Sequence, residues 1–403
     1  RIYFNMLDKI WFILIITIIF SGIYFSKKIN FKNYNFKNLT SKINKESLFL
    51  ALGTKMGVGT IIGTTLSIYI GGPSTIIWIY LFTIISSSLI YVESYLGSKY
   101  KEKTMTSYIG GIYYYTKQGL KNKKLATLML IIFITTYSIF FLMIQTNTII
   151  NTLLINKKLF TLILIILVTL LITNNVDEIR KILNKLVPII TVFFISISLY
   201  TILKNIALLP NIIKLIFKDL FTLKSITIGL VIGIKRSIFL NELLIGTTSM
   251  SSAVGNKNAY VTANTLVLGS YFIVFVISTL IALLNLIYIY KFGIHDTSYI
   301  SLLKHVFYFH YQDFGNYFLS LIITLLASSS IISGIYIGLS NITHLTKNKL
   351  IINITKIFVL SSLILGVYID TTLIWKFIDI MMFILISLNL IIIHKLSDLN
   401  NFV

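Results

Sequence analysis

A succession of long apolar runs is the feature that most constrains how this 403-residue chain can fold. A helix needs about 20 mainly apolar residues to cross the hydrocarbon core of a membrane, and by that criterion we identify about eleven candidate spans. Hydrophobic residues make up 56% of the chain and charged residues 12%, whereas soluble domains are about a quarter charged. The sequence therefore predicts an all-α polytopic membrane protein. The spans are 10–26, 48–70, 74–98, 125–154, 158–174, 182–204, 224–248, 260–291, 314–340, 350–368 and 372–395.

The distribution of positive charge predicts a membrane orientation rather than nucleic-acid binding. The formal net charge is +22, but the lysines lie in short loops between apolar runs and not along one face of a domain. The loops 27–47 and 99–124 hold six and seven lysines, and positive loops mark the cytoplasmic side. The uncharged connection 70–74 is then outside, the N-terminus is outside and the C-terminus is cytoplasmic. The stretch 207–222 alternates lysine with apolar residues and predicts an amphipathic helix on the outer surface.

The stretch "GTKMGVGTIIG", residues 53–63, places four glycines and Lys55 inside an apolar run. Glycine costs roughly 1 kcal/mol relative to alanine in a helix, so the pattern needs a reason. One reason is close helix packing through the GxxxG pairs Gly53/Gly57 and Gly59/Gly63. A second is a broken helix whose freed carbonyls coordinate a cation and whose freed N–H groups hold a carboxylate. A dinucleotide-binding loop is excluded by the wrong glycine spacing and the lack of a βαβ unit.

A second interruption favours the broken-helix interpretation. "GIKRSIFLNELLIGTTSMSSAVG", residues 233–255, places Lys235, Arg236, Asn241 and Glu242 within a later span. A charge inside a membrane is expensive and is usually paired or functional. Lys235 and Arg236 could instead extend to the interface, and Glu242 could be their structural partner. Interrupted segments at corresponding positions of two halves indicate an inverted-repeat transporter with a site near the membrane midplane.

Other polar residues within the spans have competing explanations. Glu93 lies near the cytoplasmic end of its span, where it could neutralise Lys99. Gln145 and Asn147 are two residues apart and therefore point in different directions on a helix, so one could face the core while the other packs. The serines 328–330 could bond back to their own helix or join carbonyl oxygens around a hard cation. The sequence has no cysteine, no set of metal ligands and no pairing of a nucleophile with a base, so we do not expect an enzyme.

Several blocks together resemble the alanine or glycine:cation symporters, a family with the LeuT-type arrangement. "GTKMGVGTIIGTTLSIYIGGPSTIIWIYLF" is similar to the family's G-T-G-N-I-x-G and G-G-P-G-A-x-F-W, and it is followed by "YVESYLGSKYKEK" and "GGIYYY". "IQTNTIINTL", "KRSIFLNE", "ASSSIISGIYIG" and "FIDIMMFILISLNLI" resemble four further family blocks. The resemblance covers nearly the whole chain. It implies a single transmembrane domain, 1–403, with an extra N-terminal helix at 10–26 and a 5+5 inverted repeat at about 48–204 and 224–395.

The resemblance implies symport of a small neutral amino acid, alanine or glycine, with sodium or protons as the coupling ion and no other cofactor. The expected location is the bacterial inner membrane, with the lipid bilayer but no obligate protein as partner. Substrate contacts are expected at the two breaks and on the helix between them, and an ion site is expected where carbonyls of the first break meet serine hydroxyls. The implied substrate residues are Gly57, Gly59, Thr60, Gln145, Asn147, Asn241, Glu242 and Gly246, and the implied ion ligands are Gly53, Met56, Ser329 and Ser330.

The chain departs from the family pattern at positions that matter for transport. Thr60 stands where the family has asparagine, and Leu243 and Leu244 replace an alanine and a glycine at the second break. Leucine favours helix, so we expect a smaller or less unwound site. A family glutamine corresponds to Thr262 and an aspartate to Val274. The alternative function is therefore a receptor-like or structural membrane protein that keeps the fold and has lost transport or changed its substrate.

Overall fold

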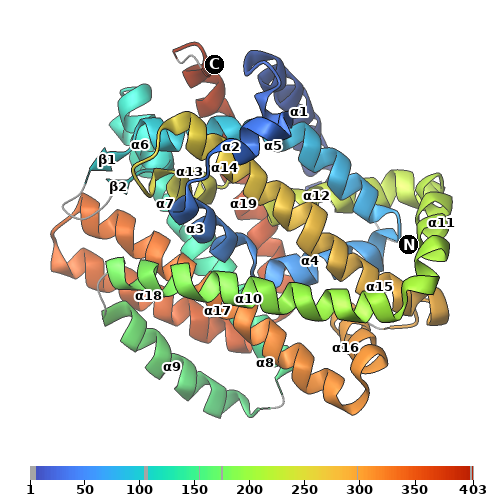
Figure 1. Cartoon of the computed structure of the whole chain (residues 1–403). Helices are drawn as coiled ribbons and strands as arrows, with labels where there is room; N and C mark the ends of the chain where they lie inside the picture. Colours follow the sequence, from blue (N-terminus) through green and yellow to red (C-terminus); the bar gives the residue numbers. More distant parts are fainter. Residues whose placement is uncertain are drawn as a thin grey trace.

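The computed structural model describes residues 6–103, 108–153, 155–173, 176–296, 298–399 and 402. Nearly all of this is helix, apart from one two-stranded antiparallel ribbon that pairs Glu102 with Ile109 and Lys103 with Tyr108 (Figure 1). The first half contains α1 (Met6–Lys28), α2 (Phe36–Ser41), α3 (Lys45–Lys55), α4 (Val58–Gly71), α5 (Thr75–Lys99), β1 (Glu102–Lys103), β2 (Tyr108–Ile109), α6 (Ile112–Gly119), α7 (Lys123–Ile134), α8 (Leu142–Thr152), α9 (Lys157–Thr173) and α10 (Val176–Lys204). The second half contains α11 (Leu209–Leu220), α12 (Leu230–Asn241), α13 (Thr247–Ala253), α14 (Ala259–Tyr271), α15 (Thr279–Phe292), α16 (Tyr299–Tyr311), α17 (Gly315–Leu345), α18 (Lys349–Tyr368) and α19 (Thr371–Ser397).

Short π-helical segments make two of the spans continuous. Thr135–Phe141 joins α7 to α8, and Phe272–Ser278 joins α14 to α15. A third π segment, Ser225–Gly229, leads into α12. Such wide turns inside α-helices are often found at functional sites, and the first of them ends at a residue that lines the cavity described below.

The prediction of a polytopic all-α membrane protein is confirmed. Within the described residues, eight helices are long and apolar enough to cross a membrane, and the bent pair α3 and α4 makes a ninth if it is one span. Two other predicted spans are less regular. Helix α9 has 17 residues, about 25 Å at 1.5 Å per residue, and the run 224–248 is divided between α12 and α13. The count of eleven and the inverted repeat stay predictions.

Both sequence interruptions are breaks in helices. α3 and α4 are bent by 51° across Met56 and Gly57, and α12 ends at Asn241 before α13 begins at Thr247. The half-helices are paired in space, because α4 packs on α12 and α3 packs on α13. Asn44 Nδ2 and Ser47 Oγ, in the first turn of α3, both donate to the carbonyl of Val254 at the end of α13, at 3.0 and 2.7 Å. The two breaks therefore lie next to each other in the interior.

Segments that the charge pattern assigns to one side of the membrane do lie together. Lys28, at the end of α1, forms a 3.7 Å ion pair with Asp398, which follows α19. Gly119, at the end of α6, packs against Leu396. On the opposite face, Asp219 of the amphipathic helix α11 accepts hydrogen bonds from the backbone N–H and hydroxyl of Ser74, at 3.0 and 2.7 Å. The predicted outer helix thus packs on the predicted outer connection, while the absolute orientation stays a prediction.

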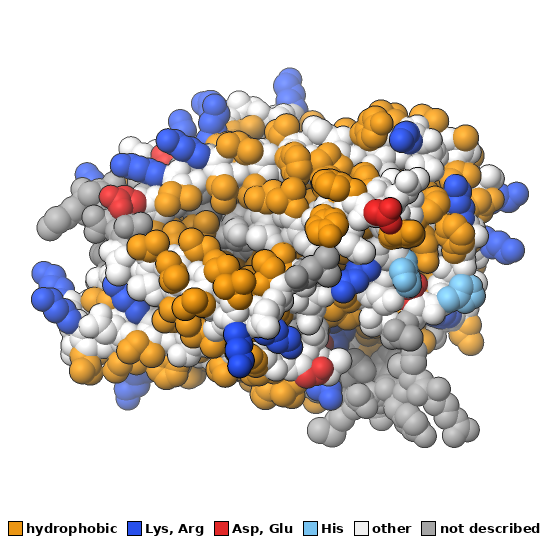
Figure 2. All heavy atoms as spheres, turned by 90° about the horizontal axis from the view of Figure 1, so that it is seen from below, with side chains coloured by type: hydrophobic (Ala, Val, Ile, Leu, Met, Phe, Trp, Pro, Cys, Tyr) orange, Lys and Arg blue, Asp and Glu red, His pale blue; other side chains and the backbone are white. Residues whose placement is uncertain are grey.

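The surface of the protein is apolar over broad areas. Figure 2 shows one face on which hydrophobic side chains cover much of the surface and many lysines and arginines lie toward the edges. On α9, Leu162, Ile166 and Leu170 are each more than half exposed. Contiguous apolar surface of this extent marks contact with a membrane rather than with water.

Candidate functional site

The first break opens a helix N-terminus in the protein interior. Gly57 is the N-cap of α4 and has an extended backbone, with no side chain to satisfy the first N–H groups of the helix. Gln145 of α8 provides one acceptor, because its Oε1 receives the N–H of Val58 at 3.0 Å. A Cβ at position 57 would overlap with the hydroxyl of Ser330 and lie 3.0 Å from Gln145 Oε1. Glycine is needed here for close approach, so the packing and broken-helix interpretations of this stretch both apply.

The second break has left-handed backbone at three positions. Glu242, Leu244 and Gly246 have φ of 49°, 59° and 102°. The N–H of Leu243 reaches back to the carbonyl of Ile238 at 3.0 Å, which closes α12 as in a Schellman motif. The segment is therefore unwound despite Leu243 and Leu244, and the expectation of a smaller or less unwound site than in the family stays a prediction. Local helix propensity is weak and tertiary contacts override it.

Glu93 and Asn389 supply those tertiary contacts. Glu93 Oε2 accepts the N–H of Leu244 at 3.1 Å, and its Oε1 accepts the amide of Asn389 at 3.3 Å. The same amide donates to the carbonyl of Leu244 at 2.9 Å, and Tyr115 donates to the Asn389 side-chain oxygen. One interpretation of the sequence was that Glu93 neutralises Lys99. Instead, Glu93 lies on α5 and holds the unwound segment. The left-handed conformation of Leu244, which costs roughly 1–2 kcal/mol, is stabilised from both sides.

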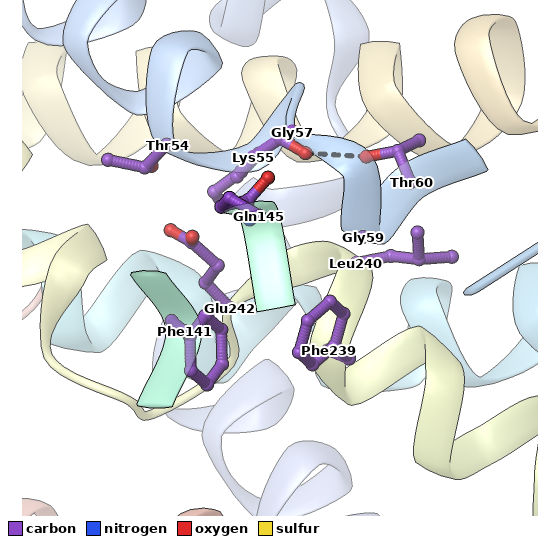
Figure 3. A pocket seen from close by; sticks show the side chains of 10 residues that line it. All are labelled: Thr54, Lys55, Gly57, Gly59, Thr60, Phe141, Gln145, Phe239, Leu240 and Glu242. Atoms are coloured by element: carbon purple, nitrogen blue, oxygen red, sulfur yellow. Dashed lines mark hydrogen bonds between the residues drawn. The ribbon is translucent and has the colours of Figure 1, made fainter. Parts of the chain in front are cut away.

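A small closed cavity lies between the two breaks (Figure 3). Every lining residue is buried. The cavity volume is about 10 Å³, which is enough room for about one water molecule. In Figure 3 the Glu242 carboxylate and the Gln145 amide point toward the unwound segment between α3 and α4. The lining residues are Thr54, Lys55, Gly57, Gly59, Thr60, Phe141, Gln145, Phe239, Leu240 and Glu242.

The cavity combines the groups that hold a zwitterion. The N-terminus of α4 carries a partial positive charge that favours a carboxylate. Across the cavity, Glu242 is 2% exposed and its Oε2 has no hydrogen-bond partner in the described part of the chain. An ammonium group could pair with this carboxylate. The rings of Phe141 and Phe239 stack with centroids 4.8 Å apart and form an apolar wall.

Five of the eight predicted substrate residues line this cavity: Gly57, Gly59, Thr60, Gln145 and Glu242. Thr60 donates its hydroxyl to the carbonyl of Lys55 across the break. Gly246 instead provides the left-handed N-cap of α13, and Asn241 donates its amide to Thr83 and Ser237, at 2.9 Å to each. Thr262 and Val274, two positions at which the chain departs from the family pattern, are not among the residues that line the cavity.

Asn147 is not among the lining residues. Its amide donates to the carbonyls of Gly366 and Ile369, at 2.9 and 2.8 Å, and its oxygen accepts the Thr371 hydroxyl at 2.6 Å. These contacts fix the junction between α18 and α19. The two side chains therefore point in different directions, as their spacing allowed. Gln145 faces the cavity, and Asn147 packs against the junction of α18 and α19.

Replacing Asn147 with alanine should lower stability without changing which amino acid binds. The variant leaves two buried backbone carbonyls without their donor, at about 1–3 kcal/mol each. We expect a lower melting temperature in detergent and an unchanged order of ligand-induced thermal shifts among amino acids. A changed order would instead indicate that Asn147 contacts the substrate.

The predicted ion ligands are only partly brought together. Ser330 Oγ lies 3.1 Å from the carbonyl oxygens of both Gly53 and Thr54. Ser329 donates to Leu326 on its own helix. The Met56 sulfur receives the Thr191 hydroxyl at 3.1 Å, whereas the predicted ligand is the Met56 carbonyl, which stays a prediction. The junction of α17 with the end of α3 therefore offers a hydroxyl and two carbonyls, which are the oxygen ligands that hard cations prefer.

Lys235 and Arg236 are paired away from the cavity. Lys235 Nζ is 3.0 Å and Arg236 Nη2 is 3.9 Å from the carboxylate of Asp379 on α19. The Arg236 guanidinium also stacks over Trp375, 4.3 Å from the ring centroid. Glu242 is thus not the partner of these cations, which was one interpretation of the sequence.

Sequence reasoning missed several residues of the site. Phe141, Phe239 and Leu240 look like ordinary apolar residues of their spans, and Asn389 lies near the end of the last one. Only Phe239 and Leu240 had a usable signal, since they immediately precede the interruption at Asn241. Phe141 reaches the cavity from the end of the π-helical segment before α8, and Asn389 reaches the second break from α19. Neither contact follows from a local pattern.

Comparison with known proteins finds sequence similarity to amino-acid symporters. The sequence model of the sodium:alanine symporter family matches residues 2–401. The probable sodium/glutamine symporter GlnT of Bacillus subtilis is 27% identical over 97% of this chain and 87% of its own length. The amino-acid carrier protein AlsT of the same organism is 26% identical over 98% of this chain and 90% of its own length. The sodium/alanine symporter AgcS of Methanococcus maripaludis is 24% identical over 53% of this chain and 50% of its own length.

Proposed function

Because this chain belongs to the sodium:alanine symporter family, we propose that it imports a small neutral amino acid, alanine or glycine, together with sodium. The observation that carries the proposal is the closed cavity in which two helix breaks meet. The N-terminus of α4 takes the substrate carboxylate and Glu242 takes the ammonium. The cavity has room for about one water, so it must widen to admit even glycine, and the stacked rings of Phe141 and Phe239 form the apolar wall that a small side chain would meet.

Sodium binds between Gly53, Thr54 and Ser330 in this proposal. Their oxygens belong to α3 and α17, so an ion at this junction would fix the half-helix that precedes the substrate cavity. Sodium would then stabilise the conformation that binds the amino acid, and by linkage the amino acid would raise the affinity for sodium equally. Rocking of one group of helices against the other would expose the cavity alternately to each side. The lysine-rich loops face the cytoplasm of a bacterial cell, with the N-terminus outside.

Uptake into proteoliposomes tests the proposal. We expect radiolabelled alanine or glycine to accumulate under an inward sodium gradient and to leave again when an ionophore collapses that gradient. Replacing external sodium with choline should reduce the rate to that of empty liposomes.

The same experiment separates transport from the receptor-like alternative. That alternative is favoured by Thr60, whose hydroxyl is bonded to the Lys55 carbonyl where the family has an asparagine. Ligand-induced thermal shifts without uptake under sodium or proton gradients would support it. Glutamine belongs in that screen, because one relative carries it in its name.

A further inference from the structure

The ammonium group of Lys55 is buried in the interior and hydrogen-bonded to oxygen atoms from two other helices. The side chain is 4% exposed, and Nζ donates to the carbonyl of Asn241 and to the hydroxyl of Ser270, at 2.7 Å each. The carbonyl belongs to the last residue of α12, where the helix dipole is negative. Ser270 comes from α14, a helix that is separate from both breaks.

Two buried carboxylates lie near this ammonium, but neither is a direct contact of it in the described part of the chain. Glu242 follows Asn241 directly and Glu93 holds Leu244, and both interact electrostatically with Lys55. They are 2% and 0% exposed, and Glu242 Oε2 makes no hydrogen bond within the described residues. Burying a carboxylate without a cation is costly. Lys235 and Arg236, on the same helix as Asn241, are engaged by Asp379.

A carbonyl and a hydroxyl in direct contact, with carboxylates nearby, also suit a hard cation such as sodium, which prefers oxygen ligands. In membrane transporters the C-terminal ends of broken helices often coordinate such ions. We propose that the break between α12 and α13 is a cation site that this chain fills permanently with the Lys55 ammonium. A covalently attached charge then does what a second sodium ion would do. The site is separate from the junction of Gly53 and Ser330 and goes beyond the proposed function.

The test is to remove the attached charge and to ask whether sodium replaces it. Lys55→Met keeps most of the side-chain volume and leaves the carboxylates without a cation. Thermal unfolding in detergent would be measured without amino acid, in sodium, potassium and choline chloride at equal ionic strength. We expect the variant to be less stable than the wild type in choline. Sodium should raise its melting temperature by on the order of 3 °C more than it raises that of the wild type.

Three further variants make the result specific. Lys55→Arg keeps a positive charge and should respond to sodium like the wild type. Lys55→Met combined with Glu242→Gln removes a carboxylate as well and should lose the added response. Lys55→Gln keeps a hydrogen-bond donor for the Asn241 carbonyl and should gain the same additional stabilisation by sodium as Lys55→Met. It replaces Lys55→Met in the test if the methionine variant does not fold.

Two outcomes would overturn the proposal. One is a shift on replacing choline with sodium that is no larger in both neutral variants than in the wild type, or that potassium produces equally. The other is failure of both to fold in sodium, since sodium should replace the lost charge. The measurement needs neither substrate nor transport, so its result is independent of whether the chain imports alanine.

Discussion

Replacing Gly57 with alanine should reduce sodium-driven uptake by about 5- to 150-fold. The backbone of Gly57 is extended, with φ −85° and ψ −172°, so alanine suits the conformation and only space opposes it. The new methyl group would overlap with Ser330 Oγ, which contacts the proposed ion ligands, and would press on Gln145 Oε1. Overpacking of this kind costs about 1–3 kcal/mol, which corresponds to that range of rates. Initial uptake rates, normalised to the amount of protein in the liposomes, measure the effect.

Gly63 is the matched control on the same helix. A Cβ there would meet Leu240 at 3.7 Å, an ordinary contact, and alanine favours a helix interior by about 1 kcal/mol over glycine. Gly63→Ala should therefore keep wild-type uptake and be as stable as the wild type or more so. If Gly57→Ala transports within twofold of Gly63→Ala, then close packing at Gly57 is not needed for transport.

The sequence predicted the class of fold and the places where the helices break. Apolar runs of membrane length and glycine-rich interruptions are local features, so they can be recognised without a structure. The conformation of each break was harder to predict. Leu243 and Leu244 favour helix when considered alone, and only the contacts of Leu244 with Glu93 and Asn389 explain why it is left-handed.

The partners of the buried charges could not be predicted either. Arg236 and Glu242 are close in sequence, but the side chain of Arg236 reaches Asp379 and that of Glu242 faces the cavity. Lys55 reaches Asn241 and Ser270, which are 186 and 215 positions away along the chain. Pairings at such separations depend on how the whole bundle packs. Spacing along one helix predicts which side chains share a face and not what that face meets.

Glu93 should be among the carboxylates on which stability depends most. Glu93→Gln keeps the shape of the side chain but only one acceptor oxygen, so it can accept from the N–H of Leu244 or from Asn389 but not from both, and Lys55 loses one of its two nearby anions. Leaving a buried hydrogen-bonding group without its partner costs about 1–3 kcal/mol, and more when a charged group is involved. We expect a clearly lower melting temperature in detergent and a matching loss of uptake, because the unwound segment then loses its brace.

Glu102→Gln is the control, since Glu102 lies 3.8 Å from Lys117 with both side chains about one third exposed. Exposed pairs of this kind contribute less than about 1 kcal/mol. Similar stability losses in the two variants would show that Glu93 is not a special support. Combining Glu93→Gln with Lys55→Met separates its two roles. If the carboxylate acted only as the counter-ion of Lys55, the double variant would be no less stable than Lys55→Met, because an uncompensated anion would be gone. If it also braces Leu244, as its hydrogen bonds indicate, the double variant remains less stable than Lys55→Met in choline, where no ion replaces the lysine.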